Sequence, residues 1–320
     1  MSAQKIIAVV GATGTQGGSV VRAILADPNG EFLARAITRD ADSAKAKELA
    51  ALGAEVVTAD LDDQDSLRRA FDGAYGAFIV TNYWAPRTPD QVAQRTAAQM
   101  ELDQAGNAAR AAGEARLRHV VWSTLEDTRP FFGLSGALVP TVDDGRYTVP
   151  HFDAKAEADE MFRELGVPTT FLHTTFFFDG LLSTLAPRRD EQGRLVLALP
   201  AADTKLSGIA SEDVGRAALG VFRRSDLVGR TISIAGEHLT GAQYATVFSE
   251  VIGEPVTYQA IPFEAMRAGT VEGANMFQFY SANEKQFTGD RDLAAVRELN
   301  PELQSFHTFL ANHLEALQLG

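Results

Sequence analysis

Three glycines near the start of the chain have the spacing of a phosphate-binding turn. Gly11, Gly14 and Gly17 form the pattern G-x-x-G-x-x-G. The first glycine of such a turn allows a tight bend, the second lets a diphosphate approach the backbone, and the third lets the next helix pack closely on the preceding strand. A purely structural glycine turn is the alternative. We predict phosphate contacts from the whole turn: Gly11, Thr13, Gly14, Thr15, Gln16 and Gly17.

Arg39 follows a strand predicted at 32–38 and bears on the choice of nucleotide. An acidic residue at this place binds the ribose 2′-hydroxyl of NAD, whereas an arginine pairs with the 2′-phosphate of NADP. We therefore predict that NADP(H) is preferred, with NAD(H) as the second cofactor. Ser43 or Lys45 would give the phosphate another partner. In the alternative interpretation Arg39 is solvated and Asp40 binds the ribose.

Residues after the later predicted strands complete the expected nucleotide site. Asp60 and Leu61 follow the third strand, where a carboxylate would accept a hydrogen bond from adenine, although Asp60 could instead cap the helix that begins near Asp65. Phe178 follows the sixth strand, where the nicotinamide ring is expected, and plain packing in the core is its alternative. Three residues after the fourth strand are expected along the ribose and diphosphate: Thr81, Asn82 and Tyr83.

His151 and Lys155 are four residues apart, so they share one face of the helix predicted at 152–165. That face continues to Ala158 and Phe162, which are apolar, so the lysine is expected to point inward. A lysine on an apolar stripe requires a partner. A cofactor ribose or carboxamide would supply one, and the alternatives are a structural ion pair or a solvent-exposed ammonium group.

The elements that must position these residues alternate between strand and helix. Ile6–Val10 is a continuous apolar run, typical of a central parallel strand that is buried on both faces. Further strands are predicted at 32–38, 55–58, 76–81, 120–124 and 169–173, and helices at 19–27, 43–52, 65–71, 89–112 and 152–165. This alternation predicts βαβ units and a parallel sheet.

Beyond residue 176 the alternation loosens. Short strands are predicted at 195–199, 231–234 and 256–260, and helices at 211–222, 241–251, 262–268, 293–298 and 305–317; a loop-rich stretch covers 130–150. We therefore predict an α/β fold, a Rossmann-type doubly wound parallel sheet with a smaller α+β C-terminal lobe. The expected domains are 1–175, which binds NAD(P) and whose sheet is completed by later segments, and 176–320, which forms a cleft for a substrate or partner.

Composition and charge limit the classes of partner. The 320-residue chain has a formal net charge of −13, and its arginines are scattered among acids, which argues against nucleic acid and anionic membranes. The absence of cysteine excludes disulfides and thiolate chemistry, and no metal-ligand spacing is present. Met1–Lys5 lacks a signal-peptide pattern, and no apolar run approaches the ~18 residues of a membrane span. We expect a cytoplasmic protein without a metal.

Several segments resemble the NmrA-like family of atypical short-chain dehydrogenase/reductases. The similarity extends over nearly the whole chain, and its most specific parts are Thr81–Trp84 and His151–Lys155, which are closest to the NADPH sensors of the family. The other segments are Val10–Gly18, Ile37–Arg39, Phe78–Val80, Phe176–Leu182 and Asn275–Tyr280. The resemblance implies a fold that binds NADP(H). In the closest relatives a second basic residue follows the arginine by four positions, where this chain has Ser43.

The resemblance also shows that the catalytic set is incomplete. Hydride-transferring short-chain dehydrogenases use a Tyr-x-x-x-Lys pair in which the tyrosine donates the proton. Here His151 stands at the place of the tyrosine and Lys155 at that of the lysine, while Ser123 or Thr124 stands at that of the family's serine. A histidine could donate a proton, and a capping or core histidine is the alternative. The candidate catalytic residues are therefore Lys155, His151 and Ser123.

Because the tyrosine is missing, the sequence favours an NADP(H)-binding redox sensor or regulator that acts through a protein partner. Some members of the family act in this way, and others are NADPH-dependent reductases. The alternative function is therefore an NADPH-dependent oxidoreductase acting on a small carbonyl or quinone substrate. The sequence is compatible with a monomer and with a dimer.

Overall fold

A seven-stranded sheet forms the centre of the first of two compact units. The computed structural model describes residues 4–135 and 139–319. Unit 1 consists of the chain up to residue 127, residues 151–174 and residues 214–232, and unit 2 consists of the remainder. The strand order is β11-β6-β5-β4-β1-β2-β3. The strands are β1 (Lys5–Val9), β2 (Phe32–Thr38), β3 (Glu55–Thr58), β4 (Gly76–Ile79), β5 (His119–Thr124), β6 (Thr169–His173) and β11 (Thr231–Ser233).

Burial explains which strands lie in the middle of this sheet. All residues of β4 and β5 are buried, and so are Ile7, Ala8 and Val9 of β1, whereas the edge strand β3 is half-exposed. Neighbours from β3 to β6 pair in parallel. A strand that is apolar on both faces is stable only when helices cover both sides. The predicted parallel sheet is confirmed.

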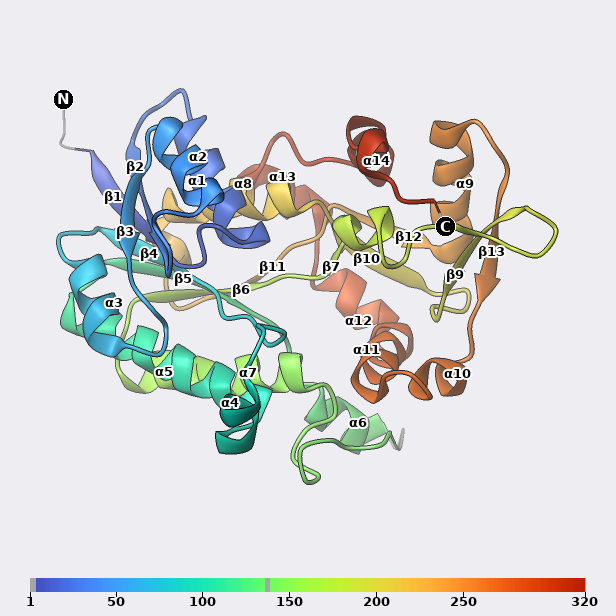
Figure 1. Ribbon diagram of the computed structural model, residues 1–320, viewed down its shortest axis with the longest axis horizontal. Helices are drawn as coiled ribbons and strands as arrows, with labels where there is room; N and C mark the ends of the chain where they lie inside the picture. Colours follow the sequence, from blue (N-terminus) through green and yellow to red (C-terminus); the bar gives the residue numbers. More distant parts are fainter. Residues whose placement is uncertain (1–3, 136–138, 320) are drawn as a thin grey trace. The chain divides into compact units, whose positions relative to one another are not determined.

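Helices cover both faces of the sheet (Figure 1). In Figure 1, α1 and α2 lie on one face with α8, and α3, α5 and α7 lie on the other, so the sheet is doubly wound as predicted. A Cβ on Gly215 would lie 2.3 Å from backbone atoms of Ser19, so glycine lets α8 pack closely on α1. The bounds are α1 (Thr15–Leu25), α2 (Ala44–Ala51), α3 (Gln64–Phe71), α5 (Ala97–Glu114), α7 (Pro150–Glu164) and α8 (Ser211–Phe222).

The single helix predicted at 89–112 is two helices, α4 (Pro89–Gln94) and α5. Arg95 is extended between them, and the Thr96 hydroxyl accepts a hydrogen bond from the backbone N–H of Gln99. A threonine side chain that caps a helix in this way starts a new helix rather than continuing the old one. Periodicity does not reveal the break, because the apolar pattern resumes directly after it.

One assignment in the later chain was wrong. The strand predicted at 231–234 was assigned to the smaller lobe, but β11 lies beside β6 in the seven-stranded sheet, where the backbone N–H of Gly229 donates to Thr169. The stretch 130–150, expected to be loop-rich, begins within α6 (Arg129–Ser135) and consists mainly of turns and irregular backbone from residue 139 to 149, where Val142 bridges Tyr147. An apolar pattern predicts neither feature. The place of β11 depends on a strand that is distant in sequence, and the structure of the other stretch depends on short-range turns.

Unit 2 contains two three-stranded sheets and several short helices, which confirms the predicted α+β lobe. Its core is aromatic: Phe178 contacts Tyr244, Phe306 and Phe309. One sheet comprises β12 (Glu237–Thr240), β10 (Lys205–Ile209) and β7 (Phe176–Phe177), and the other β13 (Val256–Ala260), β9 (Leu195–Leu199) and β8 (Arg188–Arg189). The helices are α6, α9 (Gly241–Ile252), α10 (Phe263–Arg267), α11 (Val271–Ala282), α12 (Glu284–Gly289), α13 (Leu293–Leu299) and α14 (Phe306–Asn312).

Three of these helices, α6, α11 and α12, were not predicted from the sequence. Across residues 4–135 and 139–319, no helix combines the length and apolar character needed to cross a membrane.

Candidate functional site

The glycine turn between β1 and α1 has the backbone geometry that the glycine pattern predicts. Gly11 has φ +67°, a conformation that favours glycine, and its carbonyl accepts a hydrogen bond from the N–H of Gly14. A Cβ on Gly17 would lie 2.3 Å from the Gly11 oxygen and 2.7 Å from the Val10 oxygen. Glycine at position 17 is therefore required for α1 to start directly against the end of β1.

The first turn of α1 leaves its backbone N–H groups without a side-chain cap. The residue before the helix is Gly14, whereas the helices α2, α3, α4 and α5 of the same unit are capped by Ser43, Asp63, Thr88 and Thr96. Unpaired N–H groups at the positive end of a helix bind anions, phosphate above all. Thr13 is half-buried and Thr15 is exposed beside them. The turn therefore fits a dinucleotide diphosphate.

Arg39 is exposed directly after β2. Its side chain forms no hydrogen bond or ion pair within residues 4–135 and 139–319, and the same holds for Lys45. Ser43, in contrast, is occupied, because its hydroxyl caps α2 and donates to the carbonyl of Asp40. The Asp40 carboxylate accepts the N–H of Asp42. These contacts favour Arg39 over Asp40 as the residue that faces the ribose substituent, and Lys45 over Ser43 as an additional cation.

Asp60 does not cap the helix that follows it. Asp63 caps α3, while the Asp60 carboxylate accepts the backbone N–H of Asp62 and shapes the turn after β3. Leu61 is half-buried, and its carbonyl accepts a hydrogen bond from the side chain of Asn107. Hydrogen bonds from Asp62 and Asn107 therefore hold the turn that was predicted to face adenine.

A buried ion pair lies at the carboxyl end of β4. Lys155 Nζ lies 3.1 Å from Glu101 Oε1, and it donates to the Thr81 hydroxyl at 2.7 Å and to the Thr81 carbonyl at 3.2 Å. The Thr81 hydroxyl donates in turn to Glu101 Oε1 at 2.6 Å. Lys155 thus points inward as predicted, and its ammonium group is held against one of the residues expected to line the nucleotide.

His151 is one turn before Lys155 in α7, and its ring is buried. Its centroid is 4.5 Å from that of Trp84 and 5.9 Å from that of Tyr83. Burial lowers the pKa of His151 from 6.5 to about 3, with a smaller contribution from the charge of Lys155. At neutral pH the imidazole is therefore uncharged. Its Nδ1 is buried and has no hydrogen-bond partner among the described residues, which is uncommon for a buried polar atom.

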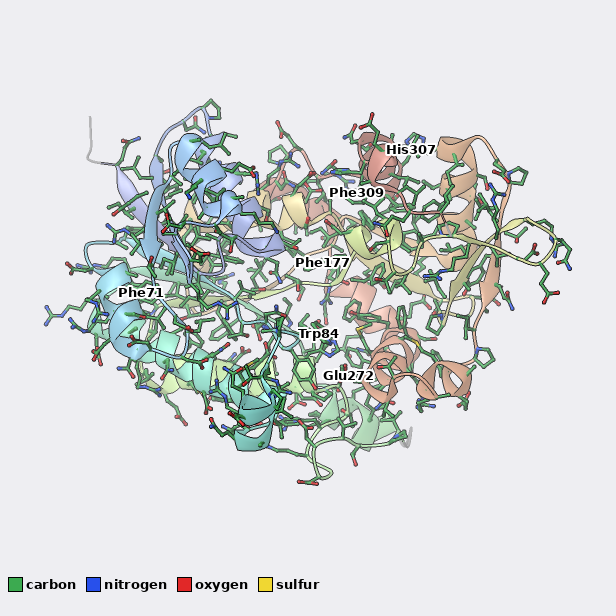
Figure 2. All side chains as sticks on the ribbon, viewed as in Figure 1. Phe71, Trp84, Phe177, Glu272, His307 and Phe309 are labelled. Atoms are coloured by element: carbon green, nitrogen blue, oxygen red, sulfur yellow. The ribbon has the colours of Figure 1, made fainter. Side chains whose placement is uncertain are left out.

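Asn82 shapes the turn that carries these aromatic rings. Its side-chain oxygen accepts the N–H of Trp84, and its carbonyl accepts the N–H of Ala85. This tight turn leaves the Trp84 side chain 62% exposed, which is unusual for an indole, and Figure 2 labels it on the segment after β4.

Residues at the end of β5 have partners on both sides of the sheet. Ser123 donates to Gln16 of α1 at 2.7 Å, and Thr124 donates to Asp159 of α7 at 2.8 Å. Trp122 donates its indole N–H to the same Asp159 oxygen. Burial raises the pKa of Asp159 to about 6, against the opposing effect of these hydrogen bonds and of His173 and Arg163. Ser123 therefore contacts the phosphate turn.

Phe178 belongs to unit 2. Its ring is fully buried within unit 2, and a Cβ on Gly208 would lie only 2.3 Å from it. This enclosure favours packing, the alternative that the sequence left open, over contact with a nicotinamide ring. Among the described residues, no group of three or more acidic or histidine side chains is arranged to hold a metal ion.

Sequence reasoning missed Glu101 and Asp159, two of the buried carboxylates of this region; a third, Asp153, also lies on α7. A signal for Glu101 was present, because it is the one acid in a stripe of small buried residues on α5 that includes Ala98, Ala105 and Ala108. An acid on the buried side of a helix requires a cationic partner, and Lys155 is that partner.

Comparison with known proteins gives a consistent assignment. The model of the NmrA-like family matches residues 3–309. The oxidoreductase malD of Malbranchea aurantiaca, named for its NmrA-like family domain, is 29% identical over 308 residues, 90% of this chain and 86% of malD. An NAD(P)H azoreductase of Xenophilus azovorans is 32% identical over 260 residues, 81% of this chain and 78% of that protein.

Among solved structures, the negative transcriptional regulator NmrA superposes with a TM-score of 0.74 at 22% identity, covering 97% of this chain and 95% of NmrA. NmrA has also been solved in complex with NAD and with NADP.

Proposed function

This chain belongs to the NmrA-like family, and from that premise we propose that it is an NADPH-dependent reductase that transfers a hydride to a small carbonyl or quinone substrate. The observation that carries the proposal is the buried Lys155 ammonium, held by Thr81 and Glu101 one turn from a buried imidazole with an unpaired nitrogen. Lys155 could hold a ribose in a sensor as well as in an enzyme, so the neutral imidazole one turn away is the feature that favours a reaction over binding alone.

The nucleotide-binding part of the proposal rests on three features of unit 1. The uncapped start of α1 would hold the diphosphate, and Arg39 would pair with the 2′-phosphate. Lys155 would hold the nicotinamide ribose at the end of β4. NADPH bound there would supply a hydride. The names of the malD and azoreductase relatives, which describe oxidoreductases of about 30% identity, support the same class of reaction.

The proposed chemistry follows from the charge of His151. A neutral imidazole is a weak acid, so His151 would orient a substrate oxygen by hydrogen bonding rather than donate a proton as imidazolium. Acceptors whose reduced form is a stabilised oxyanion suit such a site, because they do not require a strong acid during hydride transfer. A quinone meets this requirement better than a simple ketone does.

The test is NADPH consumption with a panel of quinones and aldehydes, using the wild-type protein and Lys155→Met. We expect turnover with quinones that falls at least tenfold in Lys155→Met. The matched control is Lys285→Met, since Lys285 is exposed on α12. Absence of turnover with every acceptor, together with tight NADPH binding, would refute the reductase.

A redox sensor is the second candidate function, and the missing tyrosine favours it. A sensor must bind NADP⁺ and NADPH with different affinities, and binding must change the conformation of the surface that contacts its partner. Calorimetric titration with NADP⁺, NADPH, NAD⁺ and NADH separates the two functions. A large difference between oxidised and reduced forms without turnover supports the sensor, and turnover supports the reductase.

A further inference from the structure

We propose that Glu101 is a positioning residue that keeps Lys155 charged and fixed at the carboxyl end of β4. The inference rests on the proposed function in one respect, namely that Lys155 binds the nicotinamide ribose. Glu101 itself touches Lys155 and Thr81, and its role is exerted through them.

The contacts of Lys155 define one position for its Nζ atom. Lys155 donates to the hydroxyl and carbonyl oxygens of Thr81 and pairs with one carboxylate oxygen of Glu101. The Thr81 hydroxyl donates to that same carboxylate oxygen. A lysine with several rotatable bonds is ordered in this way only when fixed acceptors surround its amine. Glu101 lies 1% exposed on α5, and Thr81 lies at the end of β4, so two different elements determine where the amine lies.

Glu101 is buried, so its carboxylate depends on its two partners, Lys155 and Thr81. An isolated carboxylate inside a protein is strongly unfavourable, and removing one partner of a buried pair leaves an uncompensated charge. Glu101 Oε2 is buried with no hydrogen-bond partner among the described residues, so the carboxylate depends on its contacts through Oε1. The arrangement is unfavourable for packing alone, which points to a role for the ammonium group.

One carboxylate forms an ion pair with Lys155 among the described residues, although a second buried acid, Asp153, lies on the same helix. Thr81 faces it from β4, the Trp122 ring lies 5.1 Å away on β5, and the neutral His151 precedes it by one turn on α7. Asp159, one turn later on α7, binds Trp122 and Thr124. Within the described part of the chain, Glu101 is the one carboxylate that forms an ion pair with Lys155.

Glu101→Gln removes the charge and keeps the shape. Without the carboxylate, the buried amine is easier to deprotonate, because an opposite charge nearby is what favours the charged form. A neutral amine that has lost its fixed partner would hold the ribose weakly. We therefore expect NADPH binding by the variant to weaken more steeply than that of the wild-type protein as the pH rises from 7 to 9.

The first experiment measures the charge of Lys155 without nucleotide. Lysine labelled with ¹³C at Cε gives a simple spectrum, since the chain has only Lys5, Lys45, Lys47, Lys155, Lys205 and Lys285. Lys155→Arg identifies the signal. We expect it to begin titrating about one pH unit or more lower in Glu101→Gln than in the wild-type protein. Glu114→Gln, the same change at an exposed site on α5, is the matched control and should leave the signal unchanged.

The second experiment measures NADPH affinity at pH 7 and pH 9. We expect Glu101→Gln to lose about tenfold between these values, while the wild-type protein and Glu114→Gln change less than about threefold. Identical titration of Lys155 and identical pH profiles in the variant and the wild-type protein would overturn the proposal. If the wild-type protein binds no NADPH, the proposed function fails, whereas the nucleotide-free titration still decides the role of Glu101.

If Glu101→Gln folds poorly, the double variant Glu101→Gln/Lys155→Met identifies the cause of the defect. If an uncompensated ammonium causes the defect, the double variant recovers the wild-type unfolding temperature at least in part. If the double variant is as defective as the single one, Glu101 serves packing and the proposal is wrong.

Discussion

Ser123 at the end of β5 donates a hydrogen bond to Gln16 at the start of α1, with 2.7 Å between the hydroxyl and amide oxygens, although the residues are 107 positions apart. The bond joins a candidate catalytic residue to the turn expected to bind the diphosphate. Ser123 is 2% exposed, so water does not easily replace the bond. The serine therefore orders the phosphate turn, whatever further contact it makes with a substrate.

Ser123→Ala is expected to weaken dinucleotide binding by about fivefold. Loss of one hydrogen bond is worth roughly 1 kcal/mol, and here it would release the Gln16 side chain. Calorimetric titration with NADPH measures the effect, and Ser249→Ala on α9 serves as a control for the substitution type. An unchanged affinity in Ser123→Ala would mean that Gln16 is held without the serine.

Arg39→Ala is expected to reduce NADPH affinity at least tenfold, about 1.4 kcal/mol, and to leave NADH affinity nearly unchanged. The reason is that an arginine pairs with the 2′-phosphate, which NADH lacks. Arg69→Ala, an exposed arginine of α3, is the control. Equal losses of affinity for the two nucleotides would mean that Arg39 contacts a part that both share. No loss for either would mean that Arg39 does not determine a preference for NADP.

Gly17→Ala is expected to destroy nucleotide binding and to destabilise the fold by several kcal/mol. The added Cβ would lie 2.3 Å from the Gly11 oxygen, a backbone atom that cannot move without opening the turn. Gly113→Ala provides the contrast, because its Cβ would meet only Val167 at 3.7 Å near the end of α5. That variant should be neutral or up to about 1 kcal/mol more stable. Chemical denaturation distinguishes the two, and comparable stabilities would contradict the argument.

The parts of this structure that the sequence predicts are those encoded over short distances. Apolar runs such as Ile7–Val9 reveal central strands, and the spacing of Gly11, Gly14 and Gly17 predicts a turn whose φ value and close contacts agree with it. The spacing of His151 and Lys155 likewise predicts a shared inward face. Each of these features is defined within one element, where periodicity and sterics suffice.

The parts that the sequence does not predict depend on how distant elements pack. Glu101 and Lys155 are 54 positions apart, and only the packing of α5 and α7 on the same face of the sheet brings them together. Phe178 was expected at the nicotinamide, but an apolar residue after a strand is equally suited to a core, and its aromatic neighbours come from α9 and α14. Figure 2 labels one of these neighbours, Phe309.

Asp159 gives the stability of the protein a pH dependence of known sign. Burial raises the pKa of Asp159 from 3.8 to about 6, so the folded state binds a proton more readily than the unfolded chain between these values. This contribution to stability is therefore present at low pH and is lost as the pH rises towards and through 6. Between pH 5 and pH 7.5 the loss should be about 1.4 kcal/mol for a group with this pKa.

Asp159→Asn tests this sign, because asparagine does not titrate and keeps an oxygen for Trp122 and Thr124. Urea denaturation of both proteins at pH 5 and pH 7.5 gives four free energies of unfolding. Other groups contribute equally to both proteins, so the difference between wild type and variant should move by about 1.4 kcal/mol in favour of the variant at pH 7.5. Asp72→Asn, at an exposed position after α3, should show no such change. A wild-type protein that instead gains stability over the variant as the pH rises would mean that the hydrogen bonds to Asp159 outweigh its burial.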